Sequence, residues 1–251
     1  MKVRILSAAV VALLSNVAFA DTFQAEAGLQ FTNTDADFLA KDIDTFSVGG
    51  TIYLKPVSDA KGPLLEAAFL DKASGLSASY SNPDSPIDEF YTLDGRFVTN
   101  GNMIIEAGYS DAFNDDTYRV GLGTYLSDTA EVLVSYTRSV DSDVDTLAAE
   151  YHGVAKLAGT ASVAYTLSAG YVDAWDSGYV VSGEATYYVN PKLGIGAVAS
   201  ISDYNNTDIT SVGIQASYFV TPTFYVQGFA RTADYDGPDE DTLGIGASFR
   251  F

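Results

Sequence analysis

Apolar and polar positions alternate with a period of two from the region of Asp21 to the last residue of the chain. The first run consists of Phe23, Ala25, Ala27, Leu29 and Phe31, separated by polar or small residues. Successive side chains of a β-strand point to opposite faces, so this alternation predicts strands with one apolar face. It recurs near residues 46–54, 91–97, 103–109, 118–126, 132–136, 147–157, 163–171, 179–189, 193–201, 210–220, 224–230 and 243–251. No convincing helical stripe follows the N-terminal segment, so the predicted fold class is all-β.

The segment 63–80 fits the alternation less well, because its apolar residues change parity. The two sets are Leu65, Ala67 and Phe69 on one parity, and Leu76, Ala78 and Tyr80 on the other. One extra residue in a strand reverses the face that its side chains meet. We therefore expect a strand with a bulge or kink near residues 71–75.

The connections between the alternating runs fall into two classes. Short ones lie at 99–101, 127–129, 158–160, 190–191 and 221–222, with the longer 56–63 as an exception. Acidic and slightly longer ones lie at 32–44, 81–88, 111–116, 141–145, 173–177, 203–208 and 233–241. Tight turns at one end and longer loops at the other are typical of outer-membrane barrels. We predict a transmembrane antiparallel up-and-down β-barrel over residues 21–251, with about fourteen strands, or twelve if one weak pair is misread. Both termini are then periplasmic, and no room remains for a plug.

The N-terminus has the pattern of a secretory signal peptide. Lys2 and Arg4 form a basic start, residues 5–14 are apolar, and residues 17–20 end in an A-x-A-like cleavage site. An apolar stretch of about ten residues is too short to span a bilayer. We expect cleavage between Ala20 and Asp21, which removes residues 1–20.

Alternation by itself does not distinguish a membrane barrel from a soluble one, but aromatic residues do so in part. They gather near the predicted strand ends as Phe23 and Phe31, Tyr187 and Tyr188, Tyr218 and Phe219, and Phe224 and Tyr225. Aromatic girdles of this kind lie at both membrane interfaces. The final strand alternates up to Phe249 and Phe251, the last residue.

Two short segments resemble known families. The ending Gly246-Ala247-Ser248-Phe249-Arg250-Phe251 resembles the C-terminal insertion signal of outer-membrane proteins, which the barrel-assembly machinery reads. The stretch Gly62-Pro63-Leu64-Leu65-Glu66-Ala67-Ala68-Phe69-Leu70 is similar to the GPLAEAAFL stretch of a porin family of gammaproteobacterial outer membranes. The resemblance implies a location in the cell outer membrane, among lipid and lipopolysaccharide, but it names no solute.

Charge and cysteine content narrow the function classes. The formal net charge is −20, and loss of Lys2 and Arg4 with the signal peptide makes it −22. Nucleic acid is excluded as a partner, because phosphate binding needs clustered cations. The acidic surface either keeps the protein soluble through charge repulsion between molecules, or it steers cations toward the protein. The chain has no cysteine, and therefore no disulfide and no thiolate metal site.

The charged residues opposite the apolar face are the candidate pore-lining residues. They are Glu26, Glu66, Asp94, Arg96, Glu106, Arg119, Glu150, His152, Lys156, Glu184, Arg231 and Arg250. Charges on the inner wall of a barrel tune which ions pass. Alternatively, they pair with one another and fill the lumen. Fourteen strands enclose more space than side chains fill, so we expect an aqueous path unless a loop, with 32–44 the longest candidate, folds inward.

Few residues of the chain suit catalysis or metal binding. His152, the only histidine, could pair with Glu150 and a serine, but lipid-modifying sites of that kind face the membrane and not the lumen. The acidic stretches 111–116, 141–145 and 237–241 match no defined calcium loop. We therefore expect no enzyme, no metal and no cofactor.

The predicted function is a porin-like passive diffusion channel for small hydrophilic solutes or ions. The competing interpretation is a structural or surface-interaction barrel with an occluded lumen.

Overall fold

The computed structural model describes residues 22–38, 41–84, 88–112, 115–204 and 207–251. The predicted signal peptide 1–20 and its cleavage site lie outside these residues.

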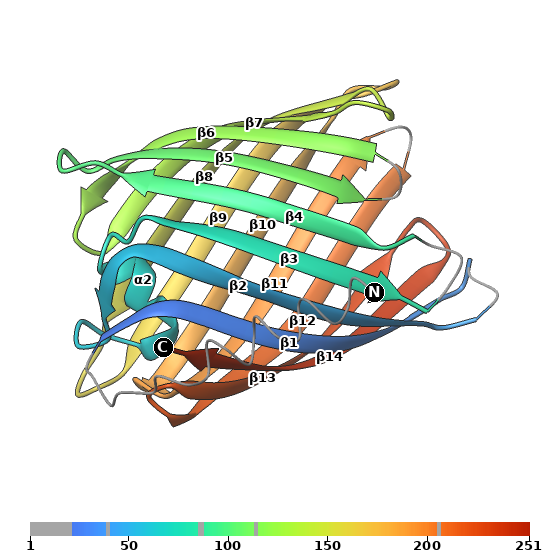
Figure 1. The fold of residues 1–251 in the computed structure, drawn as a ribbon. Helices are drawn as coiled ribbons and strands as arrows, with labels where there is room; N and C mark the ends of the chain where they lie inside the picture. Colours follow the sequence, from blue (N-terminus) through green and yellow to red (C-terminus); the bar gives the residue numbers. More distant parts are fainter. Residues whose placement is uncertain (1–21, 39–40, 85–87, 113–114, 205–206) are drawn as a thin grey trace, which may run out of the picture.

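Fourteen antiparallel strands form one closed barrel, in which each strand pairs with its neighbours in sequence and β1 pairs with β14 (Figure 1). The strands are β1 (Thr22–Ala36), β2 (Ile43–Ser58), β3 (Gly75–Pro83), β4 (Phe90–Val98), β5 (Met103–Ala112), β6 (Asp115–Ser127), β7 (Ala130–Ser139), β8 (Val144–Lys156), β9 (Ser162–Asp173), β10 (Gly178–Asn190), β11 (Leu193–Tyr204), β12 (Thr207–Thr221), β13 (Phe224–Asp234) and β14 (Asp239–Arg250). The predicted fold class and the count of fourteen are confirmed. Because the number is even, Thr22 and Phe251 lie at the same end, which we call the turn end; the opposite end is the loop end.

The barrel is apolar outside and polar inside. Leu29, Ile52 and Ile214 are all more than half exposed on the outer surface. Inside, hydroxyl groups pair across neighbouring strands, as in Ser47 with Ser81 at 2.8 Å and Ser168 with Ser182 at 2.7 Å. A soluble barrel would have the reverse arrangement, so this one is built to face lipid.

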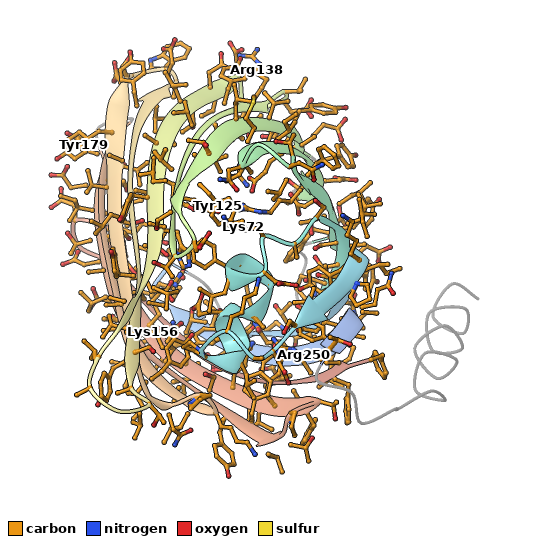
Figure 2. All side chains as sticks on the ribbon, turned by 90° about the vertical axis from the view of Figure 1, so that its left-hand side faces the viewer. Lys72, Tyr125, Arg138, Lys156, Tyr179 and Arg250 are labelled. Carbon is orange, nitrogen blue, oxygen red and sulfur yellow. The ribbon has the colours of Figure 1, made fainter. Side chains whose placement is uncertain are left out.

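The connection between β2 and β3 is not the bulged strand that the alternation predicts. Residues 59–74, which we call the insert, contain a 3₁₀ turn, η2 (Leu64–Glu66), followed by a short α-helix, α2 (Ala67–Leu70). The insert lies within the outline of the barrel at the turn end (Figure 2). The expectation that the barrel has no room for a plug is therefore wrong. None of the helices in the described part of the chain is long and apolar enough to cross a membrane.

Residues 32–44, the longest candidate for a loop that folds inward, are not the segment that enters the lumen. Most of residues 32–44 belong to strands, because β1 continues to Ala36 and pairs with β14 as far as Glu240. Strands of 9–16 residues extend into most of the acidic segments, which leaves short loops. The insert enters the lumen from the opposite end.

The aromatic pairs near the strand ends serve two surfaces rather than one. Tyr187 and Tyr218 are exposed on the outside, whereas their neighbours Tyr188 and Phe219 are 2% and 1% exposed and lie inside. Neighbouring strand residues necessarily face opposite sides. Phe23 also lies inside, since the register of β1 against β2 shifts between Phe23 and Ala25. The prediction of interfacial girdles is therefore wrong for the inner member of each pair.

Candidate functional site

The insert contacts opposite parts of the inner barrel wall through four small apolar clusters. The buried members of these clusters are Leu64 with Phe219 and Tyr225; Ala67 with Phe23 and Val57; Leu70 with Val154, Ala164 and Tyr188; and Ile104 with Tyr125 and Leu133, against which Phe69 packs. Burial of one large apolar side chain stabilises a fold by roughly 1.5–3 kcal/mol. The four clusters together hold the insert in place within the turn end.

The part of the insert nearest the junction of β1 and β14 is held by Arg250. This side chain is 3% exposed and forms an ion pair with Glu26, with 2.6 Å between Nε and Oε2. Its Nη1 donates a hydrogen bond of 2.7 Å to the carbonyl of Leu64. Arg250 faces inward as predicted, but it is sealed under the insert and does not line open space.

Glu66 lies on η2 and not on a strand, so its predicted place on the barrel wall is wrong. Its carboxylate accepts a hydrogen bond of 2.8 Å from the Tyr188 hydroxyl and lies 3.2 Å from Nε2 of His152. An ionised carboxylate only accepts, so Nε2 of His152 carries a proton and donates it to Glu66. Nδ1 forms a hydrogen bond with the Thr166 hydroxyl at 2.8 Å. The partners of His152 are therefore Glu66 and Thr166, and not Glu150 with a serine.

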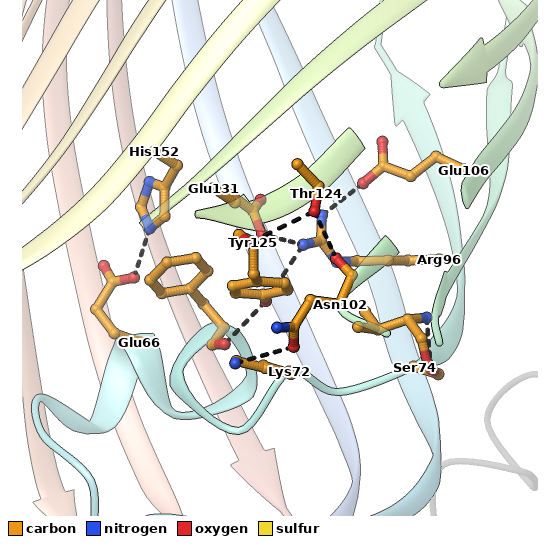
Figure 3. Close-up of polar contacts among 12 residues, drawn as sticks. Glu66, Lys72, Ser74, Arg96, Asn102, Glu106, Thr124, Tyr125, Glu131 and His152 are labelled. Carbon is orange, nitrogen blue, oxygen red and sulfur yellow. Dashed lines mark hydrogen bonds and ion pairs between the residues drawn. The ribbon is translucent and has the colours of Figure 1, made fainter. Parts of the chain in front are cut away.

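A charged network lies on the side of the insert that faces β4 to β8 (Figure 3). Arg96 donates from Nη1 to Glu106 at 2.6 Å, and from Nη2 to Glu131 and to the Tyr125 hydroxyl. The Tyr125 hydroxyl donates in turn to the carbonyl of Phe69 at 2.9 Å. The network thus connects four strands, β4 to β7, to α2.

Lys72 extends this contact to the turns at the same end. Its Nζ donates to Asn102 at 3.1 Å and forms an ion pair with Asp128 at 2.8 Å. The hydrogen bond from this ammonium lowers the pKa of the Asp128 carboxyl below its ordinary value. Both groups are outside the strands, so the pair ties the insert to the turn between β6 and β7.

A cavity of about 460 Å³ remains between the insert and the wall formed by β2 to β8. Five predicted pore-lining residues meet in it, namely Asp94, Arg96, Glu106, Arg119 and His152. Glu131, Tyr53 and Phe69 complete its polar and aromatic lining. Volumes of this size accommodate small molecules.

The other predicted pore-lining residues are spread apart. Glu150 lies on β8 opposite Leu133, outside the cavity lining. Glu184 accepts a hydrogen bond of 2.5 Å from Gln215, and Arg231 is exposed on β13. Lys156 is exposed where β8 ends at the turn end, away from the cavity (Figure 2). A role for Glu150, Glu184 and Arg231 in the pore stays a prediction.

Sequence reasoning missed Glu131, Tyr125 and Tyr188, which hold the insert or line its cavity. Glu131 directly follows a tight turn and faces the same side as buried Leu133. Glu131 alternates with Val132, so strand parity could have placed it on the inner face. Its ion pair with Arg96 could not have been predicted in this way, because Arg96 is distant in sequence. Within the described residues, no group of three or more histidine, aspartate or glutamate side chains is placed to hold a metal ion.

Comparison with known proteins agrees with this architecture. A family model described as "Putative general bacterial porin" matches residues 1–153, which is more than half of the chain. The chain belongs to this porin family. It is therefore a porin-type channel barrel of the outer membrane, in contact with membrane lipid and small solutes, and its family is one of channels rather than enzymes.

Two solved structures illustrate the range of similarity. The outer membrane protein Omp33 of Acinetobacter baumannii is 29% identical, with a TM-score of 0.74 over 92% of this chain and 99% of that chain. A bacterial polysaccharide outer membrane secretin is 12% identical, with a TM-score of 0.53 over 91% of this chain and 98% of that chain, and it shows the fold alone. A comparison with curated protein sequences gives no significant match.

Proposed function

We propose that this porin is a passive diffusion channel for small hydrophilic solutes that favours cations over anions. Solutes would enter at the loop end and leave through the cavity beside the insert. The observation that carries the proposal is the charged cavity of about 460 Å³ between the insert and the wall from β2 to β8. A barrel whose lumen was filled by side chains would leave no such space there.

The balance of charge around the cavity supports a preference for cations. Its lining includes three carboxylates, Asp94, Glu106 and Glu131, and two guanidinium groups, Arg96 and Arg119. Arg96 pairs with both Glu106 and Glu131, and Arg119 pairs with Glu106. Asp94 forms no hydrogen bond or ion pair within the described part of the chain, although it interacts electrostatically with Arg119 and Glu106. Its carboxylate is therefore the one of the three that is free to contact passing ions. Carboxylates on a pore wall favour cations.

Planar-bilayer recording of the purified protein tests this function. We expect discrete conductance steps, and a reversal potential in a KCl gradient whose sign shows cation selectivity. Steps with an anion-selective reversal potential would contradict the preference alone. Complete absence of steps from correctly folded protein would contradict the channel.

The contribution of Asp94 can be measured separately. We expect Asp94→Asn to lower the cation-to-anion permeability ratio, because the substitution removes the unpaired carboxylate from the cavity and leaves the paired charges in place. The matched control is Asp94→Glu, which keeps the charge and should retain the ratio. Equal ratios for Asp94→Asn and the unaltered protein would show that this carboxylate does not influence permeation.

One observation favours the alternative of a structural barrel with an occluded lumen. The insert is packed through four apolar clusters and reaches strands on both sides of the barrel. If the protein is structural, bilayers should stay silent while the insert is intact. Channel activity of the unaltered protein would reject this alternative.

We further propose that lipopolysaccharide surrounds the loop end and that the barrel-assembly machinery reads Phe249 and Phe251. Phe249 lies on the outer surface, where its ring stacks on Phe224 with 4.5 Å between centroids. Removal of Phe251 should reduce insertion into the outer membrane of cells. Unchanged insertion would contradict the proposed signal.

A further inference from the structure

We propose that the insert is a clasp for the seam of the barrel, where β14 pairs with β1. In this role the insert promotes closure of the barrel during assembly. The proposal concerns assembly and does not depend on what passes through the channel.

The seam is the pairing in this barrel that local chain folding cannot supply. The other strand pairs join neighbours in sequence, whereas β1 and β14 join the two ends of the chain. Glu26 and Arg250, which lie opposite each other across the seam, are 224 residues apart. Closing a long loop costs more chain entropy than closing a hairpin. Contacts at the seam must therefore offset a larger entropy loss than contacts within any hairpin of the barrel.

Arg250 joins three parts of the molecule at this seam. It belongs to β14, forms an ion pair with Glu26 of β1, and donates a hydrogen bond to the Leu64 carbonyl of the insert. Glu26 also accepts a hydrogen bond of 2.9 Å from the Tyr225 hydroxyl of β13. A buried ion pair is favourable only when further hydrogen bonds satisfy its members, and the insert provides one of them.

Aromatic rings and the insert enclose the guanidinium. The central carbon of the Arg250 guanidinium, Cζ, lies 4.5 Å from the ring centroid of Phe23, 4.7 Å from that of Phe219 and 5.5 Å from that of Tyr225. These rings come from β1, β12 and β13, on both sides of the seam. Cation–π contacts strengthen when water is removed, and Leu64 packs against two of the same rings.

The insert also has anchors beyond the seam strands. The Leu64 amide donates to the carbonyl of Pro191, in the turn between β10 and β11, at 2.8 Å. On the other side, Ala67 packs against Phe23 and Val57 of β1 and β2. The insert therefore presents a preassembled surface, tethered to β2, on which the last strand can dock as the barrel closes.

The two ends of the insert can be altered independently. Leu64 contacts the seam residues, whereas Phe69 contacts Tyr125 and His152 on the far wall. Leu64→Ala and Phe69→Ala are therefore matched truncations of one insert, with only the first directed at the seam.

Cysteine pairs can report seam closure, because the chain has no cysteine of its own. Thr34 and Thr242 face each other across the seam, with 3.3 Å between their hydroxyl oxygens. Ser168 and Ser182 face each other in the β9–β10 hairpin at 2.7 Å. The seam ratio is the disulfide yield of the first pair divided by that of the second, after a brief oxidant pulse during refolding into detergent micelles.

We expect Leu64→Ala to lower the early seam ratio by about tenfold, since loss of a packed leucine side chain typically shifts an equilibrium by at least that much. Arg250→Lys should also lower the ratio, because one ammonium cannot replace the separate donors that Arg250 directs at Glu26 and at the Leu64 carbonyl. Phe69→Ala should leave the ratio unchanged. An equal fall for Leu64→Ala and Phe69→Ala would overturn the clasp, because it would reflect general destabilisation. The clasp would also be overturned if neither Leu64→Ala nor Arg250→Lys changed the ratio.

Discussion

Phe69→Ala is expected to raise the single-channel conductance of the protein by about twofold or more, because it widens the charged cavity on the proposed path. The Phe69 ring lines the cavity beside the insert and packs edge-on against His152, with 4.3 Å between ring centroids. Its removal merges the ring's volume with the cavity. Planar-bilayer recordings of the variant and the unaltered protein at equal salt provide the measurement.

Leu64→Ala is the control for this experiment. It removes a similar apolar group from the same insert, but Leu64 does not line the cavity. Barrels of this variant that have assembled should conduct like the unaltered protein. A conductance for Phe69→Ala no larger than that for Leu64→Ala would contradict the proposed route.

Arg96→Met is expected to destabilise the folded barrel by about 3–5 kcal/mol, because it leaves a buried carboxylate without its cation. Glu131 has a side chain only 6% exposed, and Arg96 is its ion-pair partner. Arg96 also pairs with Glu106 and donates to the Tyr125 hydroxyl. Urea titration in detergent micelles, followed by circular dichroism and by heat-dependent gel mobility, measures the loss.

Two further variants show whether the buried charge is the cause. Glu131→Gln added to Arg96→Met should restore much of the lost stability, because a neutral amide is less costly to bury. Arg138→Met removes an arginine that pairs with Asp143 and Asp145 near the loop end. Its loss should cost far less stability than Arg96→Met, because solvent screens an exposed ion pair. Similar losses for Arg96→Met and Arg138→Met would refute the explanation.

Sequence periodicity was sufficient for the barrel but not for the insert. Residues 63–70 begin with proline and continue through leucine, glutamate and alanine, which are good helix formers. That signal was available locally, yet a helix of four residues has too few turns to show a stripe. The change of parity at this segment marked a break in the strand pattern without revealing that the chain enters the lumen.

The charged residues show the same limit. Strand parity predicted Asp94, Arg96, Glu106 and Arg119 on the inner wall, and in the structure all four line one cavity. Parity also placed Arg250 inside, but its aromatic enclosure comes from Phe23, Phe219 and Tyr225 on three other strands. Side-chain direction is a local property, whereas enclosure depends on residues that meet only when the barrel closes.

Alternation and turn spacing were therefore enough to predict an all-β barrel of about fourteen strands with an apolar outer surface. Both signals act over a few residues, so they can be read without the fold. Which charges face the cavity, which are sealed beneath the insert, and how Leu64 and Arg250 meet at the seam could be learned from the folded barrel alone. Those contacts join residues up to 224 positions apart, and barrel curvature and register bring them together.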